Sequence, residues 1–93
     1  MKWFSEYMMA ACDADKTIVA ANGDTYIGKM DREIADFNSS TPIEQQPVWQ
    51  IKKIEQTTSG GNTIYKTLFP KGDRRYIFAM TDALTLTYNY SVN

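Results

Sequence analysis

Residues 84–90, with the sequence LTLTYNY, alternate apolar and polar side chains in an unbroken period of two. Side chains on a β-strand point alternately to its two faces, so this pattern predicts a half-buried strand. Upstream, residues 63–69 (TIYKTLF) and 74–80 (RRYIFAM) are rich in aromatic and β-branched residues, and PKGD at 70–73 has the residue types of a turn. We therefore predict a hairpin over residues 63–80, followed by the strand at 84–90.

A further strand is predicted at residues 48–55 (VWQIKKIE), joined to this hairpin by a connection that carries Gly60 and Gly61. Residues 48–90 would then form a four-strand meander. Trp49 and Ile51 share one face of the predicted strand, whereas Ile54 falls on the other face. A β-bulge at Lys52-Lys53 would return Ile54 to the apolar face.

Two more strands are predicted at residues 17–21 and 25–29, because they flank Asn22-Gly23-Asp24 and Asn-Gly is a strong hairpin signal. The five to six strands predict a mainly β protein, built as a small antiparallel sandwich or barrel. In residues 1–12 aromatic density favours a strand, but Trp3 and Tyr7 stand at helical spacing and Met and Ala favour helix. We predict a short N-terminal helix there.

Residues 30–47 contain two prolines, a Ser-Ser-Thr run and few periodic apolar residues, which predicts a long loop or arm. The part from Met30 to Phe37 is compatible with a helical turn. The whole chain has 93 residues and a mass of 10.6 kDa, so we expect residues 1–93 to form a single domain.

Composition excludes many kinds of catalytic and metal site. The chain has no histidine and one cysteine, Cys12, so it lacks Ser-His-Asp and Cys-His pairs, the usual zinc ligand sets and any intrachain disulfide. Oxygen ligands do gather at residues 13–24, but without the spacing of an EF-hand loop. The remaining carboxylates, such as Asp73 and Asp82, need a cleft that a domain of this size has little volume for. We expect no enzyme, no metal and no cofactor.

The formal net charge is −1, and it draws the protein to neither nucleic acid nor an anionic membrane. No window approaches the roughly 20 apolar residues of a membrane span, so we expect no membrane partner. Residues 1–46 carry a net charge of −4 and residues 47–93 a net charge of +3. Interleaving of the two halves in a sheet would mix these charges, which we favour. Segregated charges would instead suit a head-to-tail contact between copies.

Twelve residues are aromatic, a heavy load for a chain of 93 residues. Trp49 and Phe78, in the middle of predicted strands, are expected in the core. Tyr, Trp and Met are favoured at interface centres. We predict protein contacts through the following aromatic residues: Trp3, Phe4, Phe37, Tyr88 and Tyr90.

Basic residues beside aromatics suggest an alternative function, a single-strand nucleic-acid-binding sheet of the OB type. The residues that would make this contact are Lys52, Lys53, Arg74, Arg75 and Tyr76. Edge strands also carry Lys and Arg to block aggregation, and the net charge is slightly acidic. We therefore rank nucleic-acid binding well below protein binding.

Four segments together resemble a pattern found in small virion proteins of tailed bacteriophages: residues 25–29 (TYIGK), 47–54 (PVWQIKKI), 76–78 (YIF) and 82–88 (DALTLTY). The resemblance spans roughly residues 25–90. Two features depart from the family pattern, because the loop after YIGK is longer and acidic and MTDA at 80–83 stands where WDDR is usual.

The resemblance implies a structural protein located in the virion and assembled in the host cytoplasm. Capsid decoration or cementing is the first placement, and a tail or connector accessory is the second. Its partners would be other virion proteins and copies of itself in a symmetric assembly. A phage-encoded inhibitor of a host protein is a third alternative.

Overall fold

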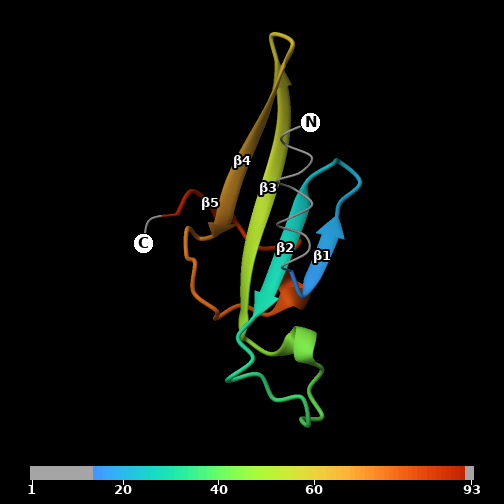
Figure 1. The fold of residues 1–93 in the computed structure, drawn as a ribbon, viewed down its shortest axis with the longest axis vertical. Helices are drawn as coiled ribbons and strands as arrows, with labels where there is room; N and C mark the ends of the chain where they lie inside the picture. The colour runs from blue at the N-terminus through green and yellow to red at the C-terminus, as the bar shows by residue number, and fades with distance from the viewer. Residues whose placement is uncertain (1–13, 92–93) are drawn as a thin grey trace.

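The computed structural model describes residues 14–91, which form one open sheet of five antiparallel strands (Figure 1). Each strand pairs with the next one along the chain, in the order β1-β2-β3-β4-β5. This confirms the mainly β prediction, with an open sheet in place of a sandwich or barrel. The predicted helix in residues 1–12 lies outside the described residues. The elements are β1 (Lys16–Val19), β2 (Thr25–Met30), η1 (Ile43–Gln45), β3 (Trp49–Ser59), β4 (Asn62–Pro70), η2 (Met80–Asp82) and β5 (Tyr88–Asn89), where η denotes a 3-10 helix.

The β1–β2 hairpin confirms the prediction made from Asn22-Gly23-Asp24. Gly23 adopts φ +93°, which a glycine reaches without steric cost. The side-chain oxygen of Asn22 accepts a hydrogen bond of 3.0 Å from the Asp24 N–H, which closes the turn locally. The residues that close this turn are adjacent in the sequence, and the turn was therefore predictable from the sequence alone.

The predicted β-bulge at Lys52-Lys53 is wrong. The register of β3 with β2 is unbroken from Trp49 to Ile54, and its register with β4 is unbroken from Lys53 to Ser59. The face that carries Trp49 and Ile51 therefore continues to Lys53 rather than to Ile54. No bulge is needed because the Lys53 ammonium is paired with carboxylates there.

The predicted hairpin over residues 63–80 is correct only in its first strand, β4. Lys71 and Gly72 both adopt positive φ, so the chain leaves the turn away from β4. Residues 74–80 form no strand, and Phe78 instead makes an isolated bridge to Trp49 of β3. Phe78 therefore pairs with the first residue of β3, on the side where β4 pairs with residues 53–59 of the same strand.

The predicted strand at residues 84–90 is also mostly wrong. It is reduced to the two residues of β5, which pair with Phe69 and Pro70. Upstream of β5, Thr85 and Leu86 donate their N–H groups to the Asp82 carbonyl and continue the turn of η2. The predicted four-strand meander over residues 48–90 therefore consists of three strands, and the turn that separates β4 from β5 is not revealed by local alternation.

The main core cluster lies on one face of the sheet, around Trp49, which is 1% exposed, and Ile27 is buried on the opposite face. Tyr26, Ile51, Met80 and Ala83 belong to the same buried cluster, and Phe78 packs against it partly buried. Trp49 was expected in the core, and the structure confirms this. Burial of these apolar side chains is the main force that holds the sheet together.

Gly28 faces this core, where no larger residue fits. A Cβ atom there would contact the sulfur of Met80 and lie 2.9 Å from its methyl carbon and 3.0 Å from the Trp49 ring. We predict that Gly28→Ala lowers the free energy of unfolding by about 1 to 3 kcal/mol, because a packed core tolerates extra volume poorly. Urea denaturation measures this loss. A smaller loss in a Met80→Ala background is expected, and an equal loss in both backgrounds would contradict the packing explanation.

The long loop predicted at residues 30–47 is present between β2 and β3, and we call residues 31–46 the arm. It begins with the predicted helical turn, in which the Ala35 N–H donates to the Asp31 carbonyl at 3.0 Å. The Gln46 amide then donates to the carbonyls of Asp36 (2.8 Å) and Thr41 (3.0 Å) and crosslinks the arm internally. The arm therefore has a defined conformation rather than that of a loose connection.

Candidate functional site

The arm exposes two large apolar side chains, those of Phe37 and Ile34. Phe37 is 58% exposed, as predicted, and its neighbour Ile34, which sequence reasoning missed, is 59% exposed. Tyr90 is 62% exposed near the C-terminus, also as predicted. Trp3 and Phe4 lie outside the described residues. Further exposed apolar residues are Val19, Ile64, Ile77 and Leu84.

Tyr88 differs from this expectation because it is half-buried. Its hydroxyl donates a 2.7 Å hydrogen bond to the Ala83 carbonyl, and its ring centroid lies 5.5 Å from that of Tyr26. Burial, with a further contribution from Tyr26, raises the pKa of the Tyr88 phenol. Tyr88 therefore closes the edge of the core, and a role for it in partner contact stays a prediction.

The residues predicted to contact nucleic acid do not form one basic stripe. Lys53 shares the core face with Trp49, whereas Lys52 points to the opposite face. The Arg75 guanidinium is held by the Asp73 carboxylate, with its Nη2 2.6 Å from Oδ2. Arg74 is exposed, and Tyr76 is half-buried. The fold thus divides the predicted set between two faces and pairs two of its four cations.

Lys53 is held at the edge of the core by charges and rings. Its Nζ lies 3.5 Å from the Asp24 carboxylate and 3.4 Å from that of Glu55. The same nitrogen is 5.7 Å from the ring centroids of both Tyr26 and Tyr88. Burial lowers the pKa of Lys53, but Tyr26, Asp24 and Glu55 outweigh that effect and raise it. These contacts give Lys53 a role in the stability of the fold, and its role in nucleic-acid contact stays a prediction.

We predict that Lys53→Met lowers the free energy of unfolding at pH 7 by about 1 to 2 kcal/mol, since it leaves a buried carboxylate without its cation. Asp24 is 8% exposed, so water does not replace the lost partner. Urea denaturation measures the loss, and the matched control is Lys66→Met, at a lysine that makes no ion pair with another residue of the described part of the chain. The loss should shrink in an Asp24→Asn background. An undiminished loss there would mean that the ion pair is not its source.

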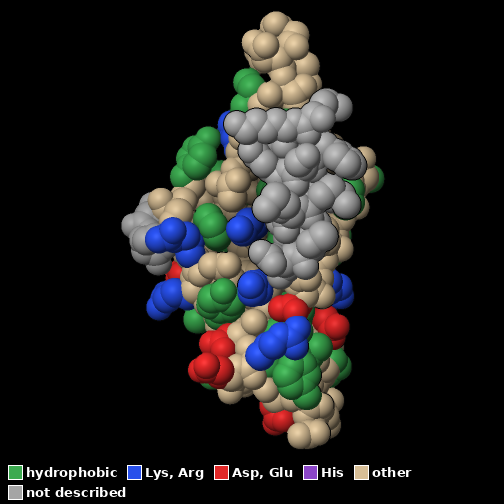
Figure 2. Space-filling view, in the orientation of Figure 1, with side chains coloured by type: hydrophobic (Ala, Val, Ile, Leu, Met, Phe, Trp, Pro, Cys, Tyr) green, Lys and Arg blue, Asp and Glu red, His purple; other side chains and the backbone are tan. Residues whose placement is uncertain are grey.

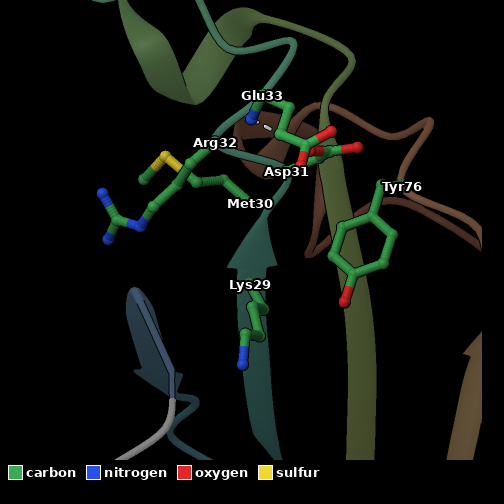
Figure 3. A pocket seen from close by; sticks show the side chains of 6 residues that line it. All are labelled: Lys29, Met30, Asp31, Arg32, Glu33 and Tyr76. Atoms are coloured by element: carbon green, nitrogen blue, oxygen red, sulfur yellow. Dashed lines mark hydrogen bonds between the residues drawn. The ribbon is translucent and has the colours of Figure 1, made fainter.

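A shallow hollow of about 460 Å³ lies where β2 passes into the arm (Figure 3). Its lining consists of Lys29, Met30, Asp31, Arg32, Glu33 and Tyr76. In Figure 3 the carboxylates of Asp31 and Glu33 lie on the side of Tyr76, and Arg32 extends in the opposite direction. Charges of both signs line the hollow, so it does not select a small anion or a small cation. Of its lining, sequence reasoning had singled out Tyr76 alone.

Asp15 fixes the place where the arm leaves the sheet. Its carboxylate accepts a 3.0 Å hydrogen bond from the Met30 N–H and forms an ion pair with Arg32. The Met30 hydrogen bond, followed by the Arg32 guanidinium, lowers the pKa of Asp15 below its ordinary value of 3.8, although partial burial opposes this. The ionised form of Asp15 therefore joins β1, β2 and the start of the arm.

We predict that Asp15→Asn lowers the free energy of unfolding by about 1 kcal/mol at pH 7, because the carboxylate accepts charge-assisted hydrogen bonds that an amide replaces poorly. A pKa that is lower in the folded state means that this stabilisation is present above 3.8 and is lost as the pH falls through the lowered value. Wild type and variant should therefore converge in acid. Thermal unfolding across pH tests this, and a difference that persists unchanged in acid would contradict it.

Charges segregate along the molecule instead of mixing, contrary to the favoured expectation. Within residues 14–91, the ion pairs join Arg32 to Asp15, Lys53 to Asp24 and Glu55, and Arg75 to Asp73. The carboxylates outside these pairs are all in the arm or η2, namely Asp31, Glu33, Asp36, Glu44 and Asp82. Figure 2 shows Asp and Glu gathered toward the lower end and most Lys and Arg side chains at mid-height.

No group of three potential metal-binding His, Cys, Asp or Glu residues occurs in the described part of the chain. Within residues 14–91, no helix has the length and apolar character needed to cross a membrane. No protein-family model, curated protein or solved structure matches the sequence or the fold.

Proposed function

We propose that this protein is a structural component of a tailed-phage virion and that it acts through contacts with other protein chains. Capsid decoration or cementing is the first placement, and a tail or connector accessory is the second. The observation that carries the proposal is the exposure of Ile34 and Phe37 on an arm with a defined conformation. The resemblance of residues 25–90 to small virion proteins supplies the phage context.

The arm holds these two side chains away from the core. Gln46 is buried, and its amide group bonds to the main chain at both Asp36 and Thr41. At the far end of the arm, the Trp49 indole N–H donates to the Ile43 carbonyl at 2.9 Å. Exposed large apolar side chains on an ordered segment are typical of surfaces that another protein covers. The arm is therefore suited to insertion into a neighbouring subunit.

The β3–β4 hairpin offers a second contact element. β3 pairs with β2 as far as Ile54, and beyond this point residues 55–59 pair, among residues 14–91, with β4 alone (Figure 1). The hairpin therefore projects past the rest of the sheet. Residues 56–65 carry no charge, although charged side chains are the usual protection of exposed strand edges. Such an edge favours strand addition by a partner.

The nucleic-acid alternative has less support because Lys53 and Arg75 are already paired with carboxylates. An inhibitor of a host protein would use the same exposed residues as a virion protein. The two are distinguished by the partner, since an inhibitor binds one host protein in solution and a virion protein is retained in the particle.

We predict that each purified particle contains a number of copies of this chain that is a whole multiple of the number of subunits in a symmetric ring or shell. Quantitative mass spectrometry of gradient-purified particles measures the copy number, and a high-salt wash controls for adhering protein. Absence from the particles, together with recovery of a single host protein in a pull-down, would overturn the proposal in favour of the inhibitor. Absence together with salt-sensitive binding to oligonucleotides would favour the nucleic-acid alternative.

A further inference from the structure

Two surfaces of opposite charge lie on this molecule. We call the carboxylates of the arm, Asp31, Glu33, Asp36 and Glu44, the acidic arm. The basic face consists of Lys29, Lys52 and Arg74, none of which makes an ion pair with another described residue. Each surface is charged in the free molecule, and each lacks a counter-charge within 4 Å among residues 14–91.

The register of the sheet places the basic face on the side opposite the core. Lys29 is the β2 partner of Gln50, and Lys52 is the β3 partner of Ile27, so both point away from the face that holds Trp49. The Gln50 side chain donates a 2.6 Å hydrogen bond to the Arg74 carbonyl and thereby holds this segment at the same face. Lys16 and Lys66 lie on the other side of the sheet, the side of the core, because their strand partners Gly28 and Glu55 are on that face.

The acidic arm adjoins the basic face. Asp31 and Glu33 line the same hollow as Lys29 and Tyr76 (Figure 3). In Figure 2, most of the basic side chains on the visible face lie at mid-height and most of the acidic side chains lie below them. A second copy that is turned end to end would therefore present carboxylates to the cations and cations to the carboxylates.

We propose that two copies of this chain pair face to face about a twofold axis, with the acidic arm of each copy against the basic face of the other. This inference rests on the proposed function, because it names the first partner in the assembly. A twofold axis satisfies both complementary contacts at once and is the commonest symmetry of soluble oligomers. A parallel pairing would instead place carboxylates against carboxylates, which costs free energy.

The exposed apolar residues of the arm give this contact its desolvated centre. Ile34 and Phe37 flank the carboxylate of Asp36 and follow that of Glu33 in the sequence. The half-buried ring of Tyr76 beside Lys29 provides an apolar surface on the opposing copy. Apolar contacts at the centre supply most of the binding free energy, whereas the surrounding charges set the orientation and the salt dependence.

Sedimentation velocity on the full chain tests the proposal. We expect a dimer at about 50 mM salt and at least a tenfold weaker association at about 500 mM, where charges are screened over a few Å. The arm variant is Glu33→Lys with Glu44→Lys, and the face variant is Lys52→Glu with Arg74→Glu. Each variant alone should sediment as a monomer. Their equimolar mixture should regain the dimer, because the unaltered acidic arm of the face variant meets the unaltered basic face of the arm variant, and at the other contact the substituted positions again carry opposite charges.

The matched control is Lys16→Glu with Lys66→Glu, which changes the net charge as much as the face variant does but on the other side of the sheet. It should remain dimeric, and circular dichroism should show that all variants are folded. A wild-type monomer at both salt concentrations would overturn the proposal. So would a mixture that stays monomeric, or a control that dissociates.

The outcome of the sedimentation experiment is independent of whether the chain is found in purified particles. A chain that is found in particles but is monomeric in solution leaves the virion assignment standing and removes the twofold pairing. A salt-sensitive dimer that is absent from particles supports the pairing and removes the virion assignment.

Discussion

The structure depends on the packing of one side chain, Trp49. Its indole ring fills the core over Gly28, where the absence of a side chain leaves the necessary space. Its ring N–H donates to the Ile43 carbonyl, and its backbone exchanges two hydrogen bonds with Phe78, at 2.9 and 3.1 Å. One residue thereby joins the sheet, the arm and the segment that follows β4. A loss of order at Trp49 would release all three together.

A single open sheet leaves much apolar surface uncovered, and this constraint connects the fold to the proposed function. The buried cluster occupies one face around Trp49, Ile51 and Met80. Residues 14–91 form no second sheet to cover what remains, and large apolar side chains of this part of the chain stay exposed on the arm and at the edges. In a solitary protein such residues favour aggregation. In an assembly they provide the contacts, and the charges around them select the partner.

The sequence was informative where neighbouring residues decide the structure. Asn22 and Gly23 close a turn with their own backbone, and Gly60-Gly61 mark the tip of the β3–β4 hairpin, so both hairpins were predictable. Residues 84–90 were not, because alternation is a local pattern whereas the burial of Ala83 against the core is a tertiary contact. Lys53 shows the same limit, since Glu55 is only two residues away but its other carboxylate partner, Asp24, lies far away in the sequence. The exposure of Phe37 was predictable from its place in a loop. The charge segregation was not, because it follows from which cations are already paired.

The central claim is that side chains on the arm, rather than a reactive site, carry the function. Hydroxyl-radical footprinting with mass spectrometry, applied to the isolated protein and to intact particles, tests this claim most directly. We expect oxidation of Phe37 and Ile34 to fall several-fold in the particle, while buried Trp49 is protected in both states. Equal labelling of Phe37 and Ile34 in the two states would contradict the account.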